Sequence, residues 1–212
     1  MSANEVYVTV AGEATAEFEE KRSVFFGHAC HAENEETAMA FVKSKQKEFS
    51  DATHNVWAYY MKNGILARYS DDGEPTGTAG LPALEAVRKS GVNDVCVVVT
   101  RYFGGILLGA GGLVRAYSKA AAMAVEAAGI VTYEPFTEFS ITCNYSDYQK
   151  ILNELPKFGV ITDSSEYTDS VILCLAVKKT IGKELFTRLS ELTADRARIK
   201  ITGERLDKRN NS

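Results

Sequence analysis

The strongest constraint on the fold is an apolar run that leads through a glycine-rich segment into an alanine-rich helix. Residues 95–99 are Val-Cys-Val-Val-Val, a continuous apolar pattern typical of a central strand that is covered on both faces. A helix is predicted from about Leu113 to Ala128, with Gly129 as its stop. Its apolar face consists mostly of alanine, so it can approach a sheet closely. Between strand and helix lie five glycines within nine residues: Gly104, Gly105, Gly109, Gly111 and Gly112.

The length and the cysteines narrow the class of protein. With 212 residues the chain can form one large domain or two small ones. No run reaches the roughly 18 apolar residues of a membrane span, and the start of the chain does not resemble a secretory signal. The four cysteines form no CxxC pair, so a reducing cytoplasm is the expected compartment. Cys96 and Cys174 lie in apolar runs and are expected to be buried.

The remaining patterns of the first half predict strands and helices around this segment. Asn34 is placed to cap a helix that ends near Phe49. Asn63-Gly64 between two strand-like runs predicts a hairpin. Pro82 suits the first turn of a helix that ends near Gly91. The strands are expected at residues 6–10, 23–31, 54–62, 65–69 and 94–103.

The second half predicts a domain of its own, with a boundary near residues 133–135. Strands are expected at 136–144, 160–167, 171–178 and 198–203, and helices at 146–158 and 182–192. This is the β-α-β-β-α-β order of ferredoxin-like domains. The sequence therefore predicts an α/β (α+β) protein with an N-terminal domain of βαβ type at 1–134 and a ferredoxin-like domain at 135–212.

The charge balance excludes a chain that is basic throughout. The net charge is −4; residues 1–134 hold 12 Lys and Arg against 17 Asp and Glu (12 − 17 = −5), and residues 135–212 hold 12 against 11 (12 − 11 = +1). Any nucleic-acid site must therefore be a local patch, and the acidic first half opposes avid binding.

The glycine-rich segment is the main candidate for a binding site. Glycines permit positive φ, and the start of a helix offers unpaired N–H groups. The segment has neither the P-loop ending nor the GxGxxG spacing, so a purely structural turn is the alternative. Three cations around it suit phosphate or an RNA backbone. The candidate ligand- or RNA-binding residues are Arg101, Tyr102, Gly104, Gly105, Gly109, Gly111, Gly112, Arg115 and Lys119.

Three carboxylates in the segment 71–80 form a second candidate site. Asp71, Asp72 and Glu74 could hold Mg²⁺, but the density of turn residues favours loop ordering. We expect them to order this loop by hydrogen bonds and an ion pair with Arg101. No metal or cofactor is assigned.

The histidines and the sequence motifs do not identify a catalytic centre. His28 and Cys30 would share one face of a strand while His31 points away, so a zinc site is not expected. His54 could act as an acid or base, although a structural histidine is the simpler interpretation. No nucleophile and base appear at a recognisable spacing, and no catalytic residue is assigned.

Two long motifs resemble those of a known family. The run TRYFGGILLGAGGLVRAYSKA, from Thr100 onward, resembles the signature of the IMPACT family in its bacterial, YigZ-like form. The loop DDGEPTGTAGLP, from Asp71 onward, resembles the family pattern as well, and so does the segment 17–25. These motifs lie in the first ~130 residues. The second half resembles the C-terminal domain of the bacterial members through its element order.

The resemblance implies a fold and a function. The N-terminal domain would share the fold of elongation factor G domain IV and of GHMP-type kinases, and the C-terminal domain would resemble the last domain of elongation factor G. Eukaryotic members carry an additional RWD domain for which this sequence has no room. The implied function is an RNA- or ribosome-associated protein that modulates translation. The alternatives are an enzyme acting on a nucleotide or phosphorylated small molecule through the glycine loop, and a protein-interaction module.

Overall fold

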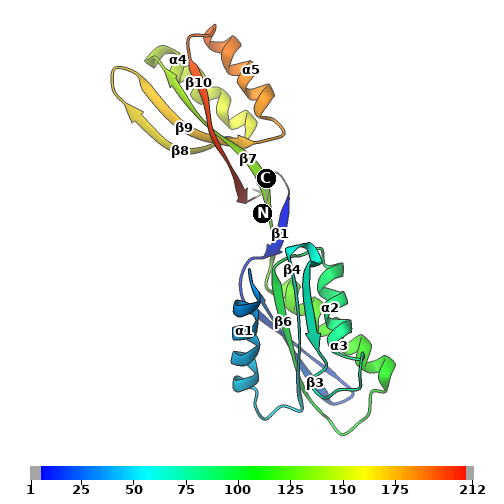
Figure 1. Ribbon diagram of the computed structural model, residues 1–212. Helices are drawn as coiled ribbons and strands as arrows, with labels where there is room; N and C mark the ends of the chain where they lie inside the picture. Colours follow the sequence, from blue (N-terminus) through cyan, green and yellow to red (C-terminus); the bar gives the residue numbers. More distant parts are fainter. Residues whose placement is uncertain (1–5, 209–212) are drawn as a thin grey trace. The chain divides into compact units, whose positions relative to one another are not determined.

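The protein is a mixed α/β chain with two five-stranded sheets. Its computed structural model describes residues 6–208 and divides into two compact units between Thr132 and Tyr133 (Figure 1). The N-terminal unit is Val8–Thr132, and the C-terminal unit contains Tyr133 onward together with Tyr7. Tyr7 packs on Tyr133, with ring centroids 5.9 Å apart.

The N-terminal unit is built on an antiparallel sheet with its most apolar strand in the middle. The order is β2-β3-β6-β4-β5, and every neighbouring pair is antiparallel. β6 therefore has a strand on each side and is buried along its length except at Tyr102, which confirms the predicted central strand. The strands are β2 (Ala14–Glu20), β3 (Ser23–His31), β4 (His54–Met61), β5 (Leu66–Ser70) and β6 (Val95–Tyr102).

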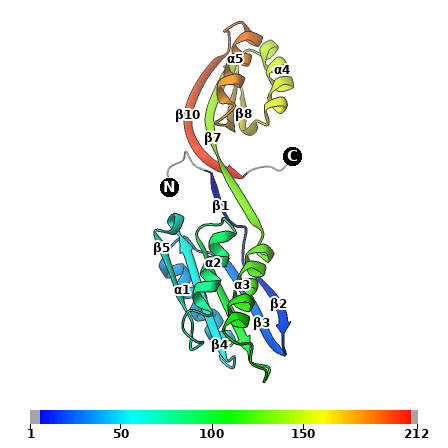
Figure 2. The same ribbon diagram turned by 90° about the vertical axis from the view of Figure 1, so that its right-hand side faces the viewer.

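Helices cover both faces of this sheet, as Figures 1 and 2 show. α1 (Glu35–Glu48) lies on one face, and α2 (Gly80–Lys89) and α3 (Ala110–Ala127) lie on the other. The residues of β6 alternate between the two cores: Val97 packs with α2 and α3, whereas Val98 packs with α1. This alternation explains the uninterrupted apolar run, because neither face of the strand meets water.

Close approach of α3 to the sheet depends on a glycine in β3. A Cβ on Gly27 would overlap the carbonyl of Ala120 and lie 3.1 Å from the Ala124 Cβ. The small residues of α3, which the sequence predicts to allow close packing, are therefore matched by a missing side chain on the strand.

Several predicted boundaries are confirmed and others are wrong. Asn34 caps α1 through its side chain, and the Asn63-Gly64 turn joins β4 to β5. β2 was not predicted, because its sequence ATAEFEE has few apolar residues and it lies at a sheet edge. α3 begins at Ala110 rather than Leu113. Gly111 and Gly112 therefore lie within the helix. The start predicted from the sequence is too late because a glycine without a cap residue gives no clear signal of a helix start.

The C-terminal unit has the predicted element order β-α-β-β-α-β. Its sheet has the order β1-β7-β9-β8, with β10 also paired to β7. β7 and β10 are longer than predicted, because they pair with each other from Thr142↔Arg198 to Tyr133↔Lys208. The strands β1 (Tyr7–Val10) and β7 (Ile130–Cys143) run across the boundary between the two units. The other elements are α4 (Tyr145–Glu154), the 3₁₀ turn η2 (Leu155–Phe158), β8 (Ile161–Tyr167), β9 (Val171–Lys178), α5 (Gly182–Thr193) and β10 (Arg198–Lys208).

The core of the C-terminal unit lies between its sheet and α4 and α5. Ile141 and Leu173 from the strands pack with Ile151 and Leu185 from the helices. Cys174 points away from this core and is exposed, so its predicted burial is wrong: β9 is covered on one face only.

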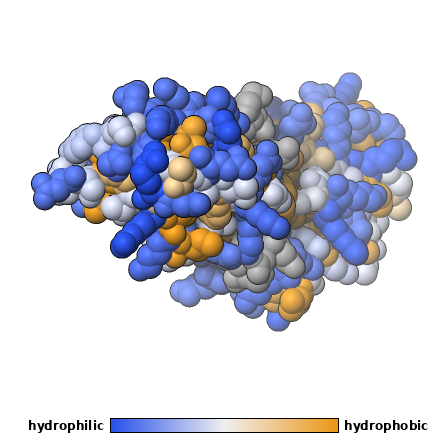
Figure 3. All heavy atoms as spheres, turned by 90° about the horizontal axis from the view of Figure 1, so that it is seen from above, coloured by the Kyte–Doolittle hydropathy of each residue, from blue (hydrophilic) through white to orange (hydrophobic). Residues whose placement is uncertain are grey.

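Hydrophilic residues dominate the surface seen in Figure 3, with hydrophobic residues in small separate patches. Within residues 6–208, no helix is long and apolar enough to cross a membrane.

Candidate functional site

A buried ion pair fixes the acidic loop to the central strand. Arg101 near the end of β6 donates from Nη1 to Glu74 Oε1 at 2.5 Å, and both side chains are almost fully buried. The guanidinium carbon lies 5.5 Å from the ring centroids of Phe25 and Phe103. Arg101 Nε is buried and has no hydrogen-bond partner. Arg101 is thus a structural cation whose charge is neutralised inside the protein by Glu74.

Two further side chains meet the same carboxylate. The hydroxyl of Tyr117 on α3 donates to Glu74 Oε1 at 2.7 Å. Burial, and then the neighbouring Glu74 carboxylate, raise the pKa of Tyr117, so the phenol remains a donor. His54 Nε2 lies 3.8 Å from Glu74 Oε1. Glu74 therefore links the acidic loop to β4, β6 and α3.

Asp71 and Asp72 order the loop by accepting backbone hydrogen bonds. The Asp71 carboxylate accepts from the N–H groups of Gly77, Ala79 and Gly80, at 2.9, 3.1 and 2.8 Å, and so occupies the N-terminus of α2. Burial alone would raise the pKa of Asp71, but these three donors lower it below its usual range.

Asp72 holds the start of β4 instead. Its Oδ2 accepts the Asn55 N–H at 2.6 Å, and its carbonyl accepts from His54 Nδ1 at 2.7 Å. Among residues 6–208, no group of three or more His, Cys, Asp or Glu side chains is arranged to hold a metal ion.

The glycines of the loop serve different geometric needs. Gly104 packs against the turn between β2 and β3, where a Cβ would overlap the Arg22 backbone, and its N–H donates to Ser23 Oγ at 3.3 Å. Gly105 and Gly109 have φ of 81° and 70°, which favour glycine. Tyr102 points elsewhere and donates to Asp51 Oδ1 at 2.8 Å.

The first turn of α3 has free donors. Gly109 precedes the helix, and no side chain within residues 6–208 caps this end. The first N–H groups of a helix have no acceptor inside the helix, so those of α3 point toward solvent or a ligand. Because α3 begins at Ala110, Arg115 lies in the second turn. A helix starting at Leu113, as predicted, would hold Arg115 in its first turn; the observed start places Arg115 further from the positive end of the helix.

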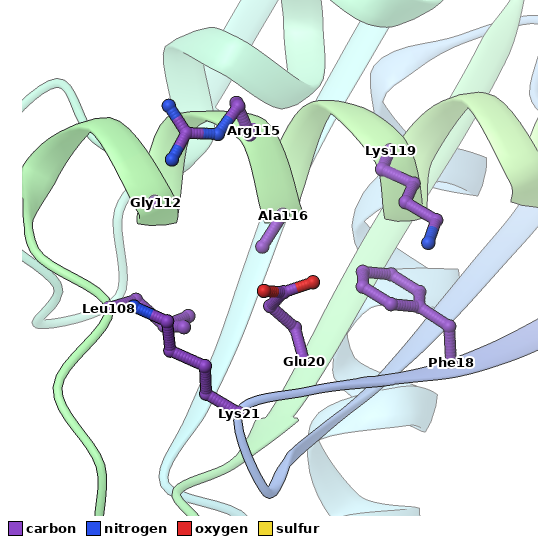
Figure 4. Close-up of a pocket in the computed structure, with 8 residues that line it drawn as sticks. All are labelled: Phe18, Glu20, Lys21, Leu108, Gly112, Arg115, Ala116 and Lys119. Atoms are coloured by element: carbon purple, nitrogen blue, oxygen red, sulfur yellow. The ribbon is translucent and has the colours of Figure 1, made fainter.

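Three cations surround a hollow beside this end of α3, shown in Figure 4. Arg115 and Lys119 reach it from α3, and Lys21 reaches it from the turn after β2. Its volume is about 230 Å³. The Glu20 carboxylate points into the space between them, and Lys119 Nζ lies 4.2 Å from the Phe18 ring centroid. Among the residues that the structure describes, none of the three cations has an ion-pair partner. The lining comprises Phe18, Glu20, Lys21, Leu108, Gly112, Arg115, Ala116 and Lys119.

A second hollow of about 420 Å³ lies where the glycine loop meets the acidic loop. Leu108 lines both hollows. The second is lined by Thr53, His54, Gly73, Glu74, Pro75, Arg101, Phe103, Leu107, Leu108, Gly109, Ala110 and Leu113.

The predicted cation triad of Arg101, Arg115 and Lys119 does not line a single hollow. Arg115 and Lys119 line the first hollow, whereas Arg101 lines the second and pairs with Glu74. Lys21 takes the third place, and sequence analysis missed it because its role depends on the unpredicted hairpin of β2 and β3. The only sequence signal for that hairpin was the charged stretch Glu19–Arg22, written EEKR.

Comparison with known proteins gives matches along both units. The family described as "Impact N-terminal domain" matches residues 21–125, and the "Domain of unknown function (DUF1949)" matches residues 141–196. The chain is 35% identical to the IMPACT family member YvyE of Bacillus subtilis, covering 92% of this chain and 90% of that protein. It is 34% identical to the IMPACT family member YigZ of Escherichia coli, covering 89% and 94%.

A solved structure and a eukaryotic protein also match this chain. A crystal structure described as that of a hypothetical protein shares 32% identity with a TM-score of 0.58, covering 93% of this chain and 98% of that one. Protein IMPACT of Danio rerio is 36% identical over 96 residues, which is 42% of this chain and 30% of that protein. These matches confirm the resemblance seen in the sequence motifs. The chain belongs to the IMPACT family.

Proposed function

We propose that this protein binds RNA, free or in the ribosome, through the N-terminal end of α3, and thereby modulates translation. The observation that carries the proposal is the hollow ringed by Lys21, Arg115 and Lys119, which form no ion pair with any residue between 6 and 208. A phosphate is the ligand that such a group of cations suits best.

The balance of charge sets the expected strength of binding. Glu20 lies among the three cations, so the hollow carries a formal charge of +2 rather than +3 (3 − 1). The free N–H groups at the start of α3 add a further favourable field for an anion. Because the chain as a whole is acidic, binding should be local, moderate in affinity and sensitive to salt.

The link to translation rests on the family. The sequence motifs of this chain resemble those of the IMPACT family. The N-terminal domain of that family is expected to share the fold of elongation factor G domain IV, and its C-terminal domain is expected to be ferredoxin-like. From this resemblance we propose that the protein acts on RNA in the cytoplasm. The Lys21–Arg115–Lys119 hollow would then be its contact with the phosphate backbone.

Removal of two of these cations should weaken RNA binding. For Arg115→Ala/Lys119→Ala we expect at least a 10-fold loss of affinity for a 20-nucleotide single-stranded RNA, because each charge-assisted contact contributes about 1–3 kcal/mol. The slope of log K against log salt should fall by about 1.4, since two phosphate contacts are lost at about 0.7 each. Fluorescence anisotropy between 50 and 200 mM salt measures both quantities.

Lys43→Ala/Lys47→Ala is the matched control. These two exposed lysines have the same spacing on α1, which covers the opposite face of the sheet. Less than a 2-fold change is expected for this control. If both double variants lose the same affinity for RNA, binding depends only on the overall charge of the protein, and the proposed site is rejected.

A further inference from the structure

We infer that the second hollow receives an unstacked base of single-stranded RNA whose backbone lies on the Lys21–Arg115–Lys119 hollow. This inference rests on the proposed RNA binding and adds what the site selects: single strands over duplex. Sequence-specific proteins commonly read RNA where bases are unstacked, and they stack such bases on aromatic or guanidinium planes.

The aromatic group required for stacking is present at the hollow. Phe103 lines it and is 45% exposed, although the ring is large and apolar. Arg101 holds the ring from within, with its guanidinium carbon 5.5 Å from the ring centroid. Arg101 is itself fixed by Glu74. Phe103 is therefore an exposed ring backed by a buried ion pair.

The apolar rim comes from the glycine loop. Leu107 lines the hollow and is 82% exposed, and the neighbouring Ile106 is 40% exposed. Exposed apolar side chains that gather beside a hollow indicate a binding surface. Leu108 joins this rim to the first hollow, because it lines both.

Polar groups for the edge of a base lie in the wall. His54 Nδ1 donates to the Asp72 carbonyl, which fixes the orientation of the imidazole. His54 Nε2 is 3.8 Å from Glu74 Oε1, which is longer than a direct hydrogen bond, so a ligand atom can still bond to it. At about 420 Å³ the hollow has room for a purine or a pyrimidine, so the wall and the stacking ring together suit a base.

The test compares a 12-nucleotide single-stranded RNA with the same sequence as a duplex, using the full chain. We expect the wild-type protein to prefer the single strand by about 10-fold, and Phe103→Leu to abolish this preference, because a leucine keeps an apolar side chain but cannot stack. Phe103→Tyr should retain the preference. A single 2-aminopurine in the strand should change its fluorescence on binding to the wild type and to Phe103→Tyr, but not to Phe103→Leu.

Tyr69→Leu is the matched control, since Tyr69 is an aromatic residue of the same unit with a similar exposure of 43% and does not line either hollow. Circular dichroism confirms that each variant is folded. Equal binding of strand and duplex, unchanged by Phe103→Leu but still weakened by Arg115→Ala/Lys119→Ala, would overturn the base hollow and leave the proposed function standing. If no RNA binds at all, both fall, and the exposed apolar loop is assigned to a protein partner.

Discussion

Glu74→Ala should lower the free energy of unfolding by about 3–5 kcal/mol, because it leaves a buried guanidinium without its counter-charge. Arg101 is only 5% exposed, so solvent compensates poorly for the lost carboxylate. The change also removes the acceptor of the Tyr117 hydroxyl. Chemical denaturation followed by circular dichroism measures the loss.

Glu85→Ala is the control for this variant. Glu85 forms a surface pair with Arg88 at 3.7 Å, and both side chains are well exposed. Such pairs contribute about 0–1 kcal/mol. If Glu74→Ala proves no more destabilising than Glu85→Ala, the ion pair does not hold the acidic loop on the sheet.

Gly27→Ala should lower the free energy of unfolding by about 1–3 kcal/mol, because the added methyl group overpacks the core. The added methyl group would overlap the Ala120 carbonyl. Neither partner can move away easily, because β3 lies between β2 and β6 and Ala120 is part of the buried face of α3. Thermal unfolding should show a lower Tm.

Gly12→Ala makes the same chemical change in open space. A Cβ at Gly12 meets no atom within 4 Å, so its stability should change by less than about 0.5 kcal/mol, as for ordinary surface substitutions. A Gly27→Ala variant as stable as Gly12→Ala would mean that α3 does not approach β3 as closely as described.

Most of the framework could be predicted because its signals are local. The apolar run of β6 indicates a strand covered on both faces, and Asn34 and the Asn63-Gly64 turn mark a helix start and a hairpin. β2 gave no such signal, since an edge strand with one half-buried face needs few apolar residues. The predicted burial of Cys174 is wrong because an apolar run does not reveal that one face of its sheet is uncovered.

The site was predicted in part only. The glycine loop and the acidic loop could be found from composition and spacing, but their partners come from distant parts of the chain. Arg101 has a neutralising partner 27 residues away in Glu74. Lys21 lies beside Arg115 because of the β2–β3 hairpin, for which the sequence gives only the weak signal of a charged stretch. Which cations remain free for a ligand is a property of the packed structure and could not be read from their spacing.

Cross-linking of the full chain to single-stranded RNA that carries 4-thiouridine, followed by mass spectrometry of the peptides, locates the bound RNA on the chain. If RNA occupies the two hollows, we expect cross-links within residues 103–119 and 18–22, two segments that border them. Cross-links confined to residues 133–208 would contradict it, as would a chain that forms none under conditions where RNA is bound.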